Sequence, residues 1–160
     1  MAFRYLQLLF PVLVGLRNVE EAILLPRWTQ RSGPWLRGAT PGALRFALAA
    51  FTALAVVVTV LSALRGARTF WAEVTFGYMI AMLINAVFPH ISVSVAERSL
   101  MPGVITAATL NLPILPLLAV LAIQQGYVAA HDGVVYSVAT GLLLLLMIPL
   151  LLKLGELLGF

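Results

Sequence analysis

Five long apolar runs, separated by short polar breaks, restrict this sequence to one kind of fold. A helix needs about 20 apolar residues to cross a hydrocarbon core roughly 30 Å thick, and each run approaches or reaches that length. Strands are a poor alternative, because the runs are continuous and leucine-rich instead of alternating, and an open sheet edge cannot be satisfied in lipid. We therefore expect an all-α integral membrane protein, folded as a multi-pass transmembrane helical bundle.

Prolines and charged residues set the expected limits of these spans. The spans are predicted at residues 5–25, 44–64, 70–88, 102–123 and 134–158. Pro26 is expected to end the first span, whereas Pro113 and Pro116 are expected to kink the fourth, since each proline removes a backbone donor. The 160 residues are 62% hydrophobic and 10% charged, which predicts a single integral membrane domain.

Basic residues are distributed unequally between the two ends of such a bundle. One end would carry Arg4, Arg65 and Arg68. The other end would carry Arg17, Arg27, Arg31, Arg37, Arg45, Arg98 and Lys153. Because basic residues favour the cytoplasmic side, we expect the N-terminus outside and the C-terminus in the cytoplasm, with a bacterial inner membrane as the default location. The net charge of +4 suits anionic headgroups and requires no nucleic-acid partner.

Two adjacent carboxylates, Glu20 and Glu21, lie inside the first predicted span. An ionisable side chain at hydrocarbon depth costs roughly 2.5 kcal/mol or more, so it usually marks a pathway, a pocket or a paired network. General acid–base chemistry is one interpretation. The other is a salt bridge to Arg17, which precedes the pair by three and four residues. Adjacent helix positions diverge by about 100°, so we expect only one of the two carboxylates to face a ligand.

Further polar residues are predicted to approach the same end of the bundle, between the first, third and fourth spans. His90 is either a base or a hydrogen-bonding group at the membrane interface. The candidate catalytic residues are Glu20, Glu21 and His90. The candidate substrate-binding residues are Arg17, Asn85, Arg98, Thr106 and Asn111. The leucine run at 141–152 has no polar group to offer, so the fifth span is expected to face lipid or to pack.

The sequence requires no cofactor. It has no cysteine, and its two histidines, His90 and His131, are expected at opposite ends of the bundle. His90 with Asn85 and a carboxylate could hold a metal ion, but with so few ligands no metal site is predicted. Motifs for phosphate binding, for a serine nucleophile and for a zinc protease are all absent from the sequence.

Several of these residues occur in an order that resembles a known family. The segments R-N-V-E-E, N-x-x-x-x-H and R-x-x-x-P-G-x-x-T, followed by a proline-rich span, look like the HXXEE-domain family of small integral membrane proteins. The resemblance covers nearly the whole chain. The family motif maps onto residues 17–21, with Arg17 in place of the histidine. The resemblance implies the same topology and site map and supplies no reaction. A proton carrier or ligand at that histidine would be lost or changed here.

The expected function is a small membrane-embedded enzyme that uses carboxylate and histidine acid–base chemistry on a lipid- or isoprenoid-like substrate, for example in isomerisation or cyclisation. The alternative is a non-catalytic accessory or binding subunit, favoured by an arginine that stays charged and cannot act as a base. A proton-coupled carrier is a third interpretation, disfavoured by the lack of a repeat. Expected partners are the bilayer, a lipophilic small molecule, and a second copy or another membrane protein.

Overall fold

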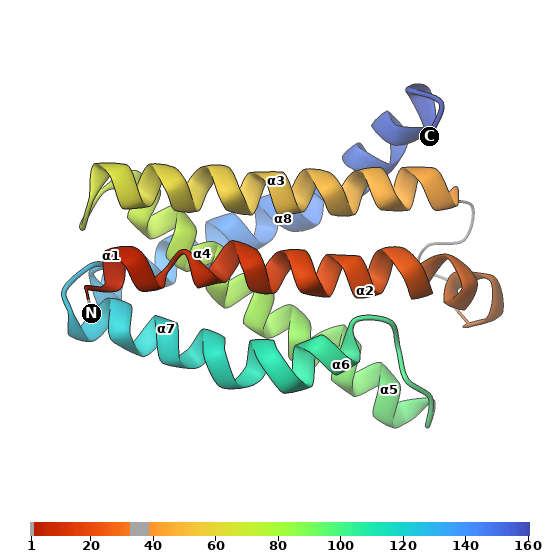
Figure 1. The fold of residues 1–160 in the computed structure, drawn as a ribbon, viewed down its shortest axis with the longest axis horizontal. Helices are drawn as coiled ribbons and strands as arrows, with labels where there is room; N and C mark the ends of the chain where they lie inside the picture. The colour runs from red at the N-terminus through yellow and green to blue at the C-terminus, as the bar shows by residue number, and fades with distance from the viewer. Residues whose placement is uncertain (1, 33–38) are drawn as a thin grey trace.

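The computed structural model describes residues 2–32 and 39–160, and within these ranges the chain is helical with no strand. The predicted all-α bundle is confirmed. Two wide π-helical turns, η1 and η2, join α4 to α5 and α6 to α7 (Figure 1). The elements are α1 (Phe3–Leu6), α2 (Leu9–Ser32), α3 (Pro41–Arg65), α4 (Phe70–Asn85), η1 (Ala86–Ile91), α5 (Ser92–Ala96), α6 (Val104–Thr106), η2 (Ala107–Asn111), α7 (Leu112–Gln124) and α8 (Ala130–Leu157). Arg37, one of the basic residues counted above, lies outside the described residues.

Four helical stretches in the described part of the chain are long and apolar enough to cross a membrane, as in an integral membrane protein. They are Pro41–Arg65, Phe70–Ala96, Val104–Gln124 and His131–Leu157. The α2 helix is not among them, because any 18 consecutive residues within it include Arg17, Glu20 and Glu21. The first predicted span therefore stays a prediction.

The prediction that Pro26 ends the first helix is wrong, since α2 continues to Ser32. Proline at this position cannot donate to the carbonyl of Ala22, four residues earlier. Arg45 on α3 supplies that missing donor, with its Nε 3.2 Å from the Ala22 carbonyl oxygen. A tertiary contact thus replaces the helical hydrogen bond.

Irregular turns lie near Pro89 in the third span and near Pro113 in the fourth. Pro116 lies inside α7, so the kink expected there stays a prediction. Phe88, just before Pro89, has non-helical angles (φ −129°, ψ 120°), so the third span bends there and then continues to Ala96 instead of ending at residue 88. The wide turn η2 comes directly before Pro113, where the missing amide leaves a carbonyl without its usual donor. The fourth helix begins at Val104, after Gly103, so Pro102 precedes its first turn.

The helices α4 and α8 cross closely and then diverge (Figure 1). At the crossing, a Cβ atom on Gly77 would lie 2.6 Å from the Tyr136 carbonyl oxygen, so glycine is what permits the contact. The other side of the bundle is an apolar core between α2, α4 and α7 that contains Phe10, Met79 and Leu115. Beyond the crossing, α4 and α8 are separated by space that neither helix fills.

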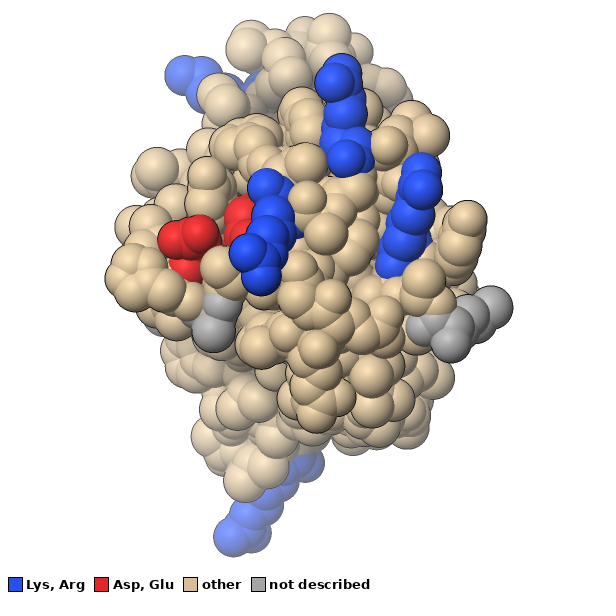
Figure 2. All heavy atoms as spheres, turned by 90° about the vertical axis from the view of Figure 1, so that its left-hand side faces the viewer, with Lys and Arg blue, Asp and Glu red and all other residues tan. Residues whose placement is uncertain are grey.

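The two termini lie at opposite ends of the molecule (Figure 1). The N-terminal end also carries the α3–α4 and α7–α8 turns, which are joined by a 2.8 Å hydrogen bond from the Arg68 amide to the Tyr127 carbonyl. A few basic and acidic side chains interrupt an otherwise uncharged surface there (Figure 2). Inside this end, Gln7 donates to the Tyr127 hydroxyl (2.8 Å), and Ser62 donates to Gln7 (2.8 Å). This network of uncharged side chains connects the end of α1 to α3 and to the α7–α8 turn.

Candidate functional site

A cavity of about 550 Å³ occupies the space between α2, α3 and the diverging α4 and α8. Most of its lining is apolar, with Leu44, Leu48 and Phe51 from α3 and Val14 and Leu25 from α2. Its polar groups are concentrated at Arg17, Asn18, Glu21, Asn85 and His90. The volume and the mostly apolar wall with few polar groups are typical of small-molecule sites.

The position of this cavity corrects one sequence expectation. The first and third spans contribute as predicted, but the remaining walls come from the second and fifth, whereas the fourth is represented only by Met101 in the turn before it. The leucine-rich α8 supplies Leu142, Leu145, Ile148 and Leu152 to the lining. The physical reason is the crossing at Gly77, which directs the second half of α8 away from α4 and leaves one of its apolar faces over the cavity.

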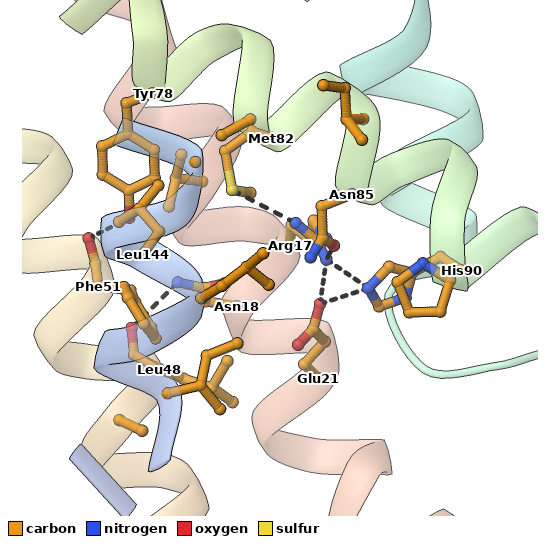
Figure 3. Close-up of a pocket in the computed structure, with 18 of the residues that line it drawn as sticks. Arg17, Asn18, Glu21, Leu48, Phe51, Tyr78, Met82, Asn85, His90 and Leu144 are labelled. Carbon is orange, nitrogen blue, oxygen red and sulfur yellow. Dashed lines mark hydrogen bonds and ion pairs between the residues drawn. The ribbon is translucent and has the colours of Figure 1, made fainter. Parts of the chain in front are cut away.

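Arg17, Glu21, Asn85 and His90 form a buried cluster at the polar end of the cavity (Figure 3). Arg17 and His90 are each 3% exposed, and Glu21 is 7% exposed. Nη2 of Arg17 lies 2.8 Å from Oε1 of Glu21 and also donates to Oδ1 of Asn85 and Nε2 of His90. Nη1 of Arg17 contacts the sulfur of Met82 at 3.5 Å. A single guanidinium thus joins α2 to the end of the third span.

The ring of His90 is oriented by the turn before the fourth helix. Its Nδ1 lies 2.7 Å from the carbonyl oxygen of Pro102. A carbonyl only accepts hydrogen bonds, so Nδ1 carries the hydrogen, and in the neutral ring Nε2 is an acceptor facing Arg17. The same Nε2 lies 3.4 Å from Oε1 of Glu21. The cluster therefore combines a fixed imidazole, a carboxylate and a permanent cation.

Glu21 is held chiefly by the positive charge of Arg17, at 2.8 Å. The two hydrogens on Nη2 of Arg17 are directed to Asn85 and His90, so none remains for Glu21 although the atoms are close. Oε1 of Glu21 is buried without a hydrogen-bond partner. A buried carboxylate in this state is unusual, because buried polar groups are nearly always bonded.

Glu20, the neighbouring residue, has an entirely different environment and does not line the cavity. Its carboxylate accepts hydrogen bonds from the amides of Gly103 (3.0 Å), Ile105 (3.3 Å) and Thr106 (2.9 Å), and from the Thr106 hydroxyl (2.7 Å). These amides begin the fourth helix, where a carboxylate is favoured by unpaired N–H groups and by the helix dipole. The expected divergence of the two carboxylates is thus present in the structure.

Gly103 lies between the surroundings of the two glutamates. Its φ of +85° is left-handed, and a Cβ atom there would lie 2.7 Å from Oε1 of Glu21 and 3.1 Å from Cε1 of His90. Glycine is therefore required both by the backbone conformation and by the close approach to the cluster. The sequence signal for this role is the Pro-Gly pair at the start of a predicted span.

The structure brings together only part of the predicted site. Arg17 and Asn85 line the cavity with Glu21 and His90, whereas Thr106 binds Glu20. Asn111 is buried in η2 away from the lining. Arg98 is exposed in the turn after α5, and in the part of the chain that the structure describes nothing bonds it to the cluster.

Other lining residues were missed by sequence reasoning. Asn18, Phe51 and Tyr78 line the cavity as well. Asn18 lies beside Arg17 in the sequence and donates to the Leu48 carbonyl (3.0 Å) and the Thr52 hydroxyl (2.8 Å). Across the described ranges, no three His, Cys, Asp or Glu side chains come together as metal ligands would.

Comparison with known proteins shows the family of this chain. Residues 8–118, well over half of the chain, match the family described as "protein of unknown function with HXXEE motif". The uncharacterized protein YrkK of Bacillus subtilis (strain 168) is 29% identical over 152 residues, which cover 95% of this chain and 96% of that protein. No solved structure matches the chain. The motif positions are the residues that carry Arg17, Glu20 and Glu21. The chain therefore belongs to the HXXEE family, as a member with arginine at the position of the motif histidine.

Proposed function

We propose that this protein is a small membrane-embedded enzyme that performs acid–base chemistry on a lipophilic substrate. The observation that carries the proposal is Glu21, a carboxylate at the polar end of an apolar cavity whose Oε1 is buried without a hydrogen-bond partner. A structural carboxylate would be expected to have bonded partners, as Glu20 has. Glu21 is instead available to exchange a proton with a bound molecule.

His90 and Arg17 suit supporting roles in such chemistry. Glu21 would transfer a proton to or from the substrate, and His90 would accept or return one at Nε2 once Arg17 shifts its contact. Arg17, whose guanidinium contacts both side chains, would hold the two groups in place. An isomerisation or a cyclisation fits this set, because one proton is added and one is removed, and neither needs a nucleotide or a thiol.

The route to the cluster supports a substrate that arrives from the bilayer. Ile84 and Phe88, at the end of the third span, line the cavity and are also 62% and 65% exposed. Leu142 and Leu145 on α8 also line the cavity and are 56% and 60% exposed. These residues form an apolar opening between α4 and α8, which we call the lateral opening.

A non-catalytic accessory or binding subunit is the second candidate. The observation that favours it is the 2.8 Å ion pair between Arg17 and Glu21, which by itself accounts for two buried charges. Such a subunit would bind a lipophilic molecule, a second copy or a partner membrane protein without turnover. Nucleic acid is no partner under either proposal.

The proposed location is a bacterial inner membrane, with the N-terminus outside and the C-terminus in the cytoplasm. The bias of basic residues supports this orientation. Because the chain has no cysteine, Ala67→Cys and Ser99→Cys give single labels at opposite ends. A membrane-impermeant maleimide applied to intact cells should modify Ala67→Cys and spare Ser99→Cys. The reverse pattern would invert the proposed topology.

The test of activity compares lipid extracts of bacterial membranes after incubation with the reconstituted protein. Wild type should deplete one neutral lipid species and produce an isomer of equal mass, separated by chromatography and identified by mass spectrometry. Glu21→Gln and His90→Ala should lose this conversion, whereas Glu97→Gln, an exposed carboxylate outside the cluster, should keep it. Full activity in both cluster variants would refute the proposed mechanism.

A further inference from the structure

The charges at the polar end of the cavity restrict the charge of the polar group, or head, of any molecule that binds there. Arg17 carries one positive charge and Glu21 one negative charge, and they balance each other at 2.8 Å. His90 adds none while its Nδ1 donates to Pro102 and its Nε2 accepts from Arg17. An anionic head beside Glu21, or a cationic one beside Arg17, would leave an uncompensated buried charge. The balance favours an uncharged head.

The hydrogen bonds of the same cluster indicate what that head must offer. The hydrogens on Nη2 of Arg17 are directed to Asn85 and His90, so this end of the guanidinium has nothing left to donate. Oε1 of Glu21, in contrast, is an acceptor that receives no hydrogen bond within the described residues. Nε of Arg17 is also buried without an acceptor. A molecule that satisfies both groups must therefore donate to Glu21 and be able to accept from Arg17. An uncharged group that donates to a carboxylate and tolerates an otherwise apolar surrounding is a hydroxyl.

The rest of the cavity indicates what the hydroxyl is attached to. The wall away from the cluster is built from aliphatic and aromatic side chains of α3, α4 and α8. The volume of about 550 Å³ has room for on the order of 20 non-hydrogen atoms, if each takes roughly 30 Å³ as in a liquid. This is the size of one lipid chain.

We infer that the ligand of this cavity is an uncharged long-chain alcohol that enters through the lateral opening and donates its hydroxyl hydrogen to Glu21. The inference rests on the proposed function, whose substrate class it names. It concerns binding, so it can hold when turnover does not occur.

The experiment is native mass spectrometry of protein released from phosphatidylcholine nanodiscs that contain one probe at a fixed mole fraction. The probes are stearyl alcohol, octadecane, stearate and stearylamine, which share a chain and differ in the head. Stearyl alcohol should give a one-to-one adduct, and the other three should show occupancies lower by about tenfold or more, as expected for one hydrogen bond to a charged group.

Two variants on α8 test the place of binding. Leu142 lines the cavity and Leu143 does not, although both are 56% exposed. Leu142→Trp should therefore remove the stearyl alcohol adduct, and Leu143→Trp should retain it. At the polar end of the cavity, the double variant Arg17→Met/Glu21→Leu removes both charges together, so no uncompensated charge is left buried. It should bind octadecane as well as stearyl alcohol.

The outcomes separate this inference from the proposed function. Equal adducts of octadecane and stearyl alcohol, or stronger binding of stearate or stearylamine, would contradict the inference that the ligand is an alcohol. The proposal of a lipophilic substrate would still stand. The absence of any adduct would overturn both. A stearyl alcohol adduct that is sensitive to Leu142→Trp, in a protein that converts no lipid, would support the inference and would contradict the enzymatic proposal alone.

Discussion

Glu20 and Glu21 are adjacent in the sequence and belong to two regions with opposite character. At the start of the fourth helix, Glu20 accepts bonds from three amides and one hydroxyl. At the polar end of the cavity, Glu21 has only the ion pair with Arg17 and a 3.4 Å approach to His90. The fold compensates the burial of Glu20 in full. It compensates Glu21 mainly in charge, and this difference is the reason we propose that Glu21 is the carboxylate kept for a ligand.

The comparison also shows how one turn connects the two regions. Gly103 donates its amide to Glu20 and packs against Glu21 and His90 through its Cα. Pro102, the preceding residue, accepts from His90. Glu20 therefore holds the Pro102–Gly103 turn in place, and this turn orients the ring of His90. Substitutions on either side should separate the structural contribution from the functional one.

The largest effect is expected from Arg17→Met. It leaves Glu21 as an uncompensated charge in a buried site, which typically lowers the free energy of unfolding by about 3–5 kcal/mol. Thermal unfolding in detergent, followed by circular dichroism, measures the loss. An unchanged midpoint would show that the ion pair does not neutralise a buried charge.

A smaller loss of stability is expected from Glu20→Ala. Removal of the carboxylate leaves the first amides of the fourth helix without their acceptor, at a cost of roughly 1–3 kcal/mol. The same unfolding measurement applies, together with binding of stearyl alcohol at saturating concentration, which should persist in the folded fraction. Loss of binding without loss of stability would assign Glu20 to the site.

The two left-handed glycines Gly103 and Gly66 provide a matched pair for the turn. Both have positive φ, at +85° and +89°, but a Cβ atom on Gly66 would meet nothing within 4 Å. Gly66→Ala should therefore lower the free energy of unfolding only through backbone strain, by on the order of 1 kcal/mol. Gly103→Ala should cost more and should also weaken ligand binding, because its methyl group displaces Glu21 or His90. Equal effects of the two substitutions on binding would contradict the role of Gly103.

Much of the fold follows from the sequence because lipid leaves few alternatives. Long leucine-rich runs must be helical, and the divergence of Glu20 from Glu21 follows from the helical period. The continuation of α2 past Pro26 could not be predicted, because the compensating donor is Arg45 on another helix. Sequence rules for proline predict a missing helical hydrogen bond, but they cannot predict a replacement donor from another helix.

The site was predictable in its polar residues and not in its shape. Arg17, Glu21, Asn85 and His90 are few and conspicuous in so apolar a chain. Leucines that face a cavity and leucines that face lipid carry the same sequence signal, as Leu142 and Leu143 illustrate. The wall formed by α8 depends on its crossing with α4 at Gly77, which only the structure shows.

The most direct test of the central claim is the double variant Arg17→Met/Glu21→Leu, measured for both unfolding and stearyl alcohol binding. Replacing a buried ion pair by apolar groups of similar volume is often neutral or stabilising. If Glu21 is retained for a ligand, the double variant should unfold within about 1 kcal/mol of wild type or above it, and its preference for the alcohol over octadecane should disappear. A loss of stability as large as that of Arg17→Met, with the preference intact, would contradict the account.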